Sequence, residues 1–501
     1  MSTDQVLQRH HEAVEPPSAT DPRRWVWLGV GAAVSLLAVH GRFDIPLAAW
    51  IFPVLLLRFT RTTPAVMGLA LVWLVSAARG VFWMVESAVP MTVITVVGAV
   101  ALGTVTVVPF VLDRITAGRA SLLLFPAALA AGELLMSVVS PFGTAFGVLA
   151  PTQHDNLVLL QVIGVTGPHG IAFLIGWFAT LVNLVWAKPK AWRRAVGAYA
   201  VVLALVLLGG GAALAFAAPS GASVRVAGVS LDTSVTRDLR AVVGADVPSQ
   251  AIDPDEVRAA FGTANDSLFA RTREAARAGA KIVVWSEQAA NVLVADEPAF
   301  LAEAAATARE ERIYLQVAEF RYLEGAPYAG NRTRLFDPTG AEVWVYDKSH
   351  PIPGLESYPA GPGVVPVVST PYGRLATVTC FDADFPELAR VDADIMIVPA
   401  RDWAEISAVH GQKANLRSVE NGYSMIRQAE FGTSGAFDPQ GRVLSSHDYA
   451  SADVHVVFSD VPVRGSSTVY RSVGDLFAWL CLAGTIVLTG FGFRRSAVPV
   501  V

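Results

Sequence analysis

The chain has 501 residues, of which 53% are hydrophobic and only 16% are charged, with a formal net charge of −5. This composition is too apolar for an ordinary soluble protein and indicates segments that lie in a membrane. The negative net charge, without a basic cluster in the polar part of the chain, argues against nucleic acid as a partner. No glycine-rich phosphate loop and no histidine or cysteine cluster with metal spacing occurs, so we expect no metal and no organic cofactor.

The chain begins with a polar tail, residues 1–23, which has no hydrophobic core and is expected to be disordered in the cytoplasm. Residues 24–218 are then almost continuously apolar, and a last apolar segment falls within 474–495. Because crossing a bilayer takes about 20 apolar residues, we predict a multi-pass helical domain of seven spans and one C-terminal span. The eight predicted spans are residues 25–40, 45–58, 64–85, 91–112, 121–139, 169–187, 195–218 and 476–493.

The positive charges alternate along these spans. Every second junction is basic, whereas the junctions between them contain only Arg42. The basic junctions contain Arg23, Arg24, Arg58, Arg61, Arg114, Arg119, Lys188, Lys190, Arg193, Arg194, Arg494 and Arg495. Since positive residues stay on the cytoplasmic side, both termini are predicted to be cytoplasmic and residues 223–465 to lie outside the cytoplasm. A polar tail without a small-residue cleavage site makes a removable signal peptide unexpected.

Residues 223–465 have the composition of a globular domain and alternate short β-branched runs with helical stretches, which predicts an α/β fold. At roughly 240 residues, the region is long enough for a core of its own. The predicted strands are 224–229, 281–285, 313–317, 375–380 and 394–398, the predicted helices are 255–278 and 298–312, and hairpins are expected around 337–340 and 370–373.

Three reactive side chains follow predicted strands of this domain. Glu287 follows Ile-Val-Val-Trp-Ser, Lys348 follows Val-Trp-Val-Tyr-Asp, and Cys380 follows Leu-Ala-Thr-Val-Thr. Each alone fits an ordinary structural role, but together they supply a base, a cation for an oxyanion and a thiol nucleophile, which is the equipment for acyl transfer. The other cysteine, Cys481, lies in the last predicted span, so no disulfide with Cys380 is expected.

Three motifs around these residues resemble the carbon–nitrogen hydrolase (nitrilase) superfamily: Trp285-Ser286-Glu287, Tyr346-Asp347-Lys348-Ser349-His350 and Cys380-Phe381-Asp382. The resemblance implies a four-layer α-β-β-α sandwich with a Glu-Lys-Cys catalytic triad. A nitrilase-like domain between seven N-terminal spans and one C-terminal span is, further, similar to the apolipoprotein N-acyltransferase family, and this likeness covers nearly the whole chain.

That likeness implies transfer of a fatty acyl chain from a membrane phospholipid to the α-amino group of the N-terminal diacylglyceryl-cysteine of a lipoprotein. The expected partners are therefore a phospholipid donor, a diacylated lipoprotein acceptor and the bilayer of a bacterial plasma membrane. In this reading Glu287 is the base and Cys380 carries the acyl group as a thioester. Lys348 and the backbone N–H of Phe381 stabilise the oxyanion.

Further residues have supporting roles by the same likeness. Glu356 would hold the lysine as a second carboxylate, and His350 would position the lysine loop. Trp403 and Tyr358 are candidates for the wall of the acyl-chain site, with ordinary core packing as the alternative. Arg79 could meet a phospholipid head group or extend to the membrane interface. The other histidines considered, which we expect to be polar loop residues, are His154, His169 and His410.

Two loops depart from the family pattern. Gly354-Leu355 replaces a Phe-Gly pair before Glu356, and Arg401-Asp402-Trp403-Ala404 replaces an Asn-Asp-Ala-Trp-Phe type of loop. These departures keep two other interpretations open. One is a membrane-tethered amidase or acyltransferase with a different donor or amine, and the other is a non-catalytic membrane scaffold.

Overall fold

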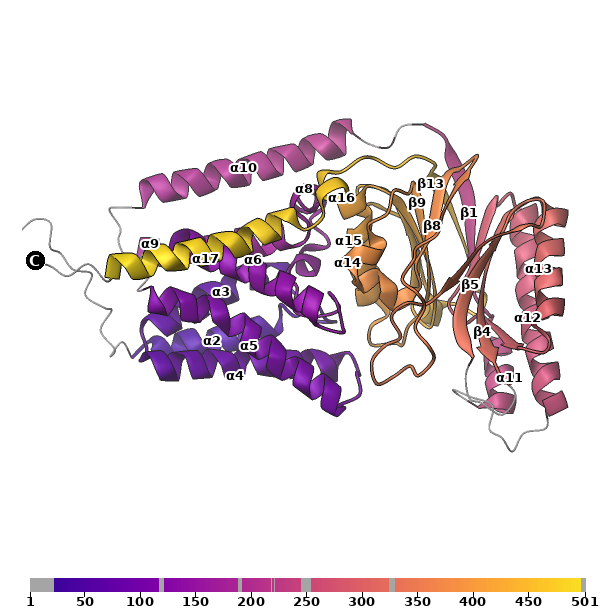
Figure 1. Cartoon of the computed structure of the whole chain (residues 1–501), viewed down its shortest axis with the longest axis horizontal. Helices are drawn as coiled ribbons and strands as arrows, with labels where there is room; N and C mark the ends of the chain where they lie inside the picture. The colour runs from indigo at the N-terminus through magenta and orange to yellow at the C-terminus, as the bar shows by residue number, and fades with distance from the viewer. Residues whose placement is uncertain are drawn as a thin grey trace, which may run out of the picture.

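The computed structural model describes residues 22–116, 121–187, 192–217, 219, 221–244, 254–323 and 329–496. Residues 1–21 of the predicted tail lie outside these ranges, as do Arg119, Lys188 and Lys190 of the predicted cytoplasmic junctions. Figure 1 shows a bundle of helices from the N-terminal part of the chain and the last helix, next to an α/β domain formed by the sequence between them.

The bundle contains five helices in the described ranges that are long and apolar enough to cross a membrane. They are α4 (Ala65–Glu86), α5 (Val93–Ile115), α6 (Ser121–Val139), α9 (His169–Ala187) and α10 (Arg193–Phe216). Three further apolar helices are α2 (Arg24–Leu36), α3 (Pro46–Arg61) and α17 (Leu476–Ser496), and short turns between α6 and α9 are η2 (Ala150–Gln153), α7 (Leu157–Leu160) and α8 (Ile163–Thr166).

The prediction of eight spans is therefore confirmed only for five of them. At 1.5 Å per residue, the 13 residues of α2 and the 16 of α3 cover about 20 and 24 Å, less than the roughly 30 Å of a bilayer core. In α17, Leu476–Gly492 forms a shorter apolar helix than the five above. The sequence pattern located these helices, but their length does not by itself establish a complete crossing.

Two β-sheets form the centre of the α/β domain. The first, with seven strands, has the order β13 (Val456–Pro462), β1 (Ser223–Val229), β2 (Ile282–Trp285), β4 (Tyr314–Tyr322), β5 (Gly330–Phe336) and β6 (Glu342–Asp347), with β3 (Ala290–Leu293) paired to β4. The second, with six strands, has the order β12 (Val443–Asp448), β11 (Thr433–Phe437), β10 (Ser424–Glu430), β9 (Ile395–Arg401), β8 (Gly373–Thr377) and β7 (Val367–Thr370).

The two sheets pack face to face, and helices cover their outer faces. Between them lies an aliphatic core to which Val226 and Ile282 of the first sheet and Ile395 and Ile397 of the second contribute. Outside the first sheet lie α12 and α13, and outside the second lie α14 and α15, facing the bundle (Figure 1). The helices of the domain are α11 (Thr233–Val243), α12 (Pro254–Arg277), α13 (Glu297–Glu311), α14 (Pro386–Ala389), α15 (Ser407–Asn421) and, before α17, α16 (Val469–Val473).

The bundle and the domain share hydrophobic clusters at their boundary. Phe142 and Phe146, which follow α6, pack in one cluster with Phe381 and Phe385. A second cluster includes Leu416 of α15 and helices of the bundle. The loop that carries Cys380 is thus packed directly against membrane-associated helices.

Candidate active site

Two carboxylates, the buried Glu287 and the partly exposed Glu356, surround the ammonium of Lys348. Lys348 follows β6, and its Nζ donates to Glu287 Oε1 at 2.8 Å and to Glu356 Oε1 at 2.9 Å. Lys348 and Glu287 are 0% and 1% exposed, so this pair is shielded from water. Burial alone would lower the pKa of Lys348, but the charges of Glu287 and Glu356 outweigh it and hold this pKa well above its ordinary value. Lys348 is therefore a fixed cation.

Asn331 positions the carboxylate of Glu287 through a hydrogen bond. Asn331 Nδ2 donates to Glu287 Oε1 at 2.7 Å and to the Tyr358 hydroxyl at 3.0 Å. Tyr358 is buried, and burial raises the pKa of its hydroxyl, so it stays protonated. Tyr358 thus belongs to the hydrogen-bond network around the carboxylate. Sequence reasoning missed Asn331, since a single asparagine inside a strand forms no recognisable pattern.

Cys380 lies on a tight turn, and the prediction that strand 375–380 extends to it is wrong. β8 ends at Thr377, and Cys380 begins a 3₁₀ turn, η3 (Cys380–Asp384). The Thr379 side chain and the Asp382 side chain cap this turn reciprocally, which stops the strand. Cys380 has a φ of 51°, a left-handed conformation that is uncommon for a residue other than glycine and is characteristic of functional sites.

Asp382 joins the cysteine turn to the lysine loop. One of its carboxylate oxygens accepts from the N–H of Ser349 at 3.2 Å, the N–H of Thr379 at 3.3 Å and the Tyr346 hydroxyl at 2.7 Å. The other accepts from the N–H of His350 at 2.7 Å. Because Asp382 is fully buried, these bonds fix the two loops relative to each other.

His350 lies between the same two loops. Its Nδ1 is 3.2 Å from Asp382 Oδ1, and its ring stacks on Phe385 with 3.6 Å between centroids. It contacts the loop of Lys348 through its own backbone and the cysteine turn through its ring. This position fits the role of holding the lysine loop.

The thiol itself is buried, at 2% exposure, next to the end of β9. Cys380 packs on Ala400, and the carbonyl of Ala400 accepts from the N–H of Glu287 at 3.2 Å, so β9 brings base and thiol together. Burial raises the pKa of the Cys380 thiol, Glu287 raises it further, and Lys348 acts in the opposite direction; the pKa stays well above its ordinary value. Cys380 is therefore a neutral thiol that needs a base before it can attack.

A second polar cluster borders the thiol and was missed by sequence reasoning. A ring nitrogen of His410, a carboxylate oxygen of Asp402 and Cys380 Sγ lie within 4.8 Å of one another. Asp402 accepts from both His410 Nδ1 and Arg427 NH2 at 2.8 Å. This spacing would suit a metal ion, but the guanidinium of Arg427 already supplies the positive charge that Asp402 binds. His410 was expected to be a polar loop residue. It is instead buried in α15, where its ring is hydrogen-bonded to Asp402.

An apolar pocket connects Cys380 with the helical bundle. Phe381 and Trp403 line it beside the thiol, and Trp83 and Phe146 line it from the bundle. Trp403 Nε1 also donates to the carbonyl of Ser87, directly after α4, at 2.6 Å. The pocket is closed by side chains of both parts of the chain and suits an aliphatic substrate.

Comparison with known proteins places the chain in a family. The "Apolipoprotein N-acyltransferase N-terminal domain" model matches residues 30–181, and the "Carbon-nitrogen hydrolase" model matches residues 262–463. The apolipoprotein N-acyltransferase of Geobacter metallireducens is 26% identical, over 71% of this chain and 71% of that protein. The apolipoprotein N-acyltransferase of Caulobacter vibrioides is 25% identical, over 64% of this chain and 66% of that protein. This chain belongs to the apolipoprotein N-acyltransferase family.

Among solved structures, an amidase from Nesterenkonia sp. aligns with a TM-score of 0.38 and 19% identity, over 49% of this chain and 93% of that one. The family match and the apolar helices together identify a membrane protein with a nitrilase-like α/β domain.

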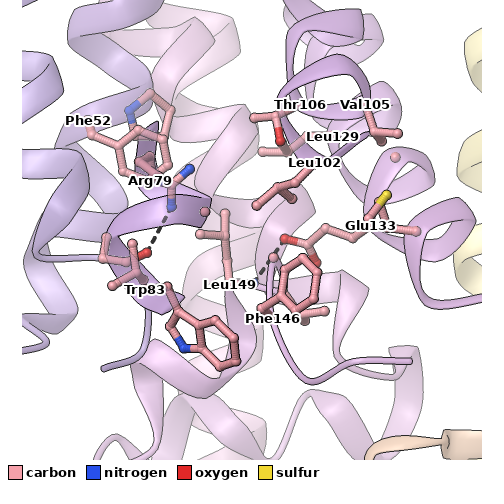
Figure 2. Close-up of a pocket in the computed structure, with 18 of the residues that line it drawn as sticks. Phe52, Arg79, Trp83, Leu102, Val105, Thr106, Leu129, Glu133, Phe146 and Leu149 are labelled. Carbon is pink, nitrogen blue, oxygen red and sulfur yellow. Dashed lines mark hydrogen bonds between the residues drawn. The ribbon is translucent and has the colours of Figure 1, made fainter. Parts of the chain in front are cut away.

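Arg79 lies in a different cavity of this N-acyltransferase-family protein, inside the helical bundle. Its guanidinium donates to the carbonyls of Ser35 at 3.1 Å and Ala38 at 2.9 Å. Figure 2 shows Arg79 among the residues that line this cavity. Glu133 lines the same cavity and accepts from the N–H of Leu149 at 3.0 Å. Arg79 is thus held by bundle carbonyls rather than placed beside Cys380.

The buried His169 also corrects an expectation, since it was predicted to be a polar loop residue. It begins α9, is 1% exposed, and its ring lies 3.5 Å from Glu133 and 3.9 Å from Asp475, which precedes α17. It therefore connects three segments of the bundle.

Replacing Glu287 with glutamine is expected to lower the pH at which the Cys380 thiol ionises. The charge of Glu287 raises the pKa of Cys380 and the charge of Lys348 lowers it, so removing the charge of Glu287 should lower this pKa. The midpoint of iodoacetamide labelling against pH, followed by peptide mass spectrometry, measures this shift. Cys481, buried in α17, gives an internal reference. A midpoint equal to or above that of the wild type would contradict the placement of Glu287 beside the thiol.

Proposed function

We propose that the protein transfers a fatty acyl chain from a membrane phospholipid to the α-amino group of the N-terminal diacylglyceryl-cysteine of a lipoprotein. The observation that carries the proposal is a buried Glu287–Lys348 pair beside Cys380, at the end of an apolar pocket shared with the helical bundle. The names of the related proteins support the same reaction.

In the first half-reaction, Glu287 takes the proton of the Cys380 thiol as the sulfur attacks the ester carbonyl carbon of the phospholipid. The ammonium of Lys348 and the backbone N–H of Phe381 stabilise the tetrahedral oxyanion. As the intermediate collapses, the C–O bond breaks and the leaving alkoxide takes the proton from Glu287. The products are a lysophospholipid and a Cys380 thioester.

In the second half-reaction, the amine of the lipoprotein attacks the thioester carbonyl, and Glu287 accepts a proton from the nitrogen. The C–S bond then breaks, an amide forms, and the proton returns to Cys380. Because the thioester has to persist until the acceptor arrives, water must be excluded. The apolar lining by Phe381, Trp403 and Phe146 supports this requirement.

The supporting residues hold the reacting side chains and their loops in place. Glu356 accepts from Lys348 and also from the N–H of Ile352 at 2.7 Å, so it fixes the ammonium to the loop that follows it. We assign to His350 the holding of the lysine loop, and to Trp403 part of the wall around the acyl chain. We assign to Tyr358 the positioning of Asn331, whose amide donates to the Tyr358 hydroxyl and to Glu287. Arg79 is assigned to the stability of the bundle.

We further propose the eight-span topology, with both termini in the cytoplasm of a bacterium and the domain of residues 223–465 on the outer side of its plasma membrane. The alternation of basic junctions supports this orientation. The short helices α2 and α3 would be accommodated by local thinning of the bilayer, as is usual for a span shorter than the hydrocarbon core.

Intact mass spectrometry after incubation with phospholipid vesicles tests the function. The wild type is expected to gain the mass of one fatty acyl group, and the Cys380→Ala variant is not. A diacylated lipopeptide should then remove the adduct and appear as the triacylated product. An adduct that the lipopeptide never removes would show that the acceptor is a different amine. The absence of any adduct would favour the amidase or the non-catalytic scaffold.

A further inference from the structure

A second pocket, which we call the polar pocket because charged side chains of Arg240, Glu356, Arg401 and Asp402 line it, adjoins the apolar pocket of Cys380. It has a volume of about 580 Å³, and the two pockets share four lining residues, Ile352, Leu355, Arg401 and Trp403. The residues that line only the polar pocket include Arg240, Gln288, Phe431 and Tyr449. A molecule with one end in the apolar pocket can therefore extend its other end toward this polar space.

Two arginines stack on one aromatic ring in the polar pocket. The guanidinium carbon of Arg240 lies 4.4 Å from the centroid of Phe431, and that of Arg401 lies 5.4 Å from it. Phe431 has a φ of 56°, a conformation that a bulky residue rarely adopts and that is typical of functional sites. The strained backbone presents the ring as a platform for both cations.

The two arginines differ in their surroundings. Arg401 Nε donates to Glu430 at 3.1 Å and its NH1 to Gln288 at 3.0 Å, which fixes its plane. Arg240 is exposed on α11, and the carboxylate nearest to its charge, Glu430, is already bound by Arg401. Arg240 can therefore turn its donors toward a ligand at little cost, while Arg401 is already positioned.

A phosphate group is the ligand that this arrangement fits. Guanidinium groups bind phosphate oxygens through paired N–H donors, and stacking on a ring leaves those donors available at the edge. In a glycerophospholipid the phosphate is only a few bonds from the acyl ester. With the ester carbonyl at Cys380, the phosphate would lie within reach of the adjoining pocket. The acceptor amine is a poor occupant, because the carboxylates that line this pocket, Glu356 and Asp402, already pair with Lys348 and Arg427, whereas Arg240 and Arg401 would repel a positive charge.

We infer that Arg240 and Arg401, stacked on Phe431, bind the phosphodiester of the phospholipid donor and thereby place its ester at Cys380. The inference rests on the proposed function and adds a recognition site to it. Arg401 is the first residue of the loop that departs from the family pattern, so this subsite is a property of this chain's own sequence.

The test measures acyl-enzyme formation by the full-length protein from two donors. One is phosphatidylglycerol in vesicles, and the other is a p-nitrophenyl ester of the same fatty acid, which has no phosphate. Arg240→Ala is expected to slow loading from the phospholipid about tenfold, as for the loss of a charged hydrogen bond, and Arg240→Glu is expected to slow it more. Arg240→Lys should retain most of the rate. None of these variants should change loading from the p-nitrophenyl ester.

Arg237→Ala is the matched control, because Arg237 lies on the same helix with its side chain 73% exposed. It should load from both donors like the wild type. Equal loading by wild type and Arg240→Ala from phospholipid would overturn the inference. So would an equal loss with both donors, or a loss confined to discharge by the lipopeptide. Millimolar inorganic phosphate should leave wild-type loading unchanged; inhibition that disappears in Arg240→Ala would identify a free-phosphate site instead.

Failure of the proposed function is a separate result. It would appear as a wild type that never loads from phospholipid. The subsite remains testable in that case by native mass spectrometry of bound phosphatidylglycerol. Retention of this lipid by the wild type and by Arg237→Ala, with loss in Arg240→Glu, supports the subsite; equal retention by all three overturns it.

Discussion

Replacing Lys348 with methionine is expected to abolish acyl-enzyme formation and to lower the free energy of unfolding of the protein by about 3–5 kcal/mol. The ammonium holds the buried Glu287 at 2.8 Å and the partly exposed Glu356 at 2.9 Å. Without it, two carboxylates would remain close together and uncompensated. The measurements are acyl loading by intact mass spectrometry and thermal unfolding of the purified protein.

A double variant separates the two effects of this substitution. Adding Glu287→Gln to Lys348→Met removes one of the buried charges, so it should recover part of the lost stability while loading remains absent. Lys281→Met, at an exposed lysine beside β2, is the matched control and should change neither quantity. A Lys348→Met protein as stable as the wild type would show that the carboxylates do not depend on this cation.

Replacing Asp382 with asparagine is expected to slow acyl loading about 100-fold, because a displacement of about 1 Å between reacting groups has that effect. It should also reduce stability by about 2–3 kcal/mol, since a buried charge-assisted network loses an acceptor. The amide can present only one oxygen to the donors of Ser349, Thr379 and His350, and its NH₂ group faces the others. Loading rate and thermal unfolding measure the two effects.

The control for this variant is Asp392→Asn, which alters a carboxylate whose side chain is 69% exposed. A surface ion pair contributes little to the free energy of unfolding, so Asp392→Asn should load and unfold like the wild type. Normal loading by Asp382→Asn would show that the cysteine turn and the lysine loop keep their relative position without the carboxylate.

Much of the α/β fold could be predicted because its strands are short apolar runs that are easily recognised. Ile282–Trp285 is completely buried, and the sequence indicated a strand there. The hairpins around 337–340 and 370–373 were predicted from their Pro-Thr-Gly and Pro-Tyr-Gly turns, and β5–β6 and β7–β8 confirm them. The predicted end of the strand before Cys380 was wrong, because the apolar pattern of the sequence does not reveal that two side chains cap a turn.

The surroundings of the thiol depend on contacts between distant segments, which periodicity cannot reveal. Asn331 reaches Glu287 from a separate strand, and Arg427 reaches Asp402 from β10. Their residue types are ordinary at those positions. His410 was misjudged because a histidine in a polar stretch looks exposed until its partner Asp402 is known. The count of eight membrane spans is not confirmed for a simpler reason, since hydropathy locates a helix more securely than it fixes its length.

The bond from Trp403 to the carbonyl after α4 has a consequence for how this reaction is kept from becoming hydrolysis. One wall of the chamber around Cys380 is supplied by Trp83 and Phe146 of the bundle, so the α/β domain alone would have an open side. Water entering there would cleave the thioester and release free fatty acid. The bundle would then act as the seal that makes a hydrolase fold a transferase, besides anchoring it in the membrane.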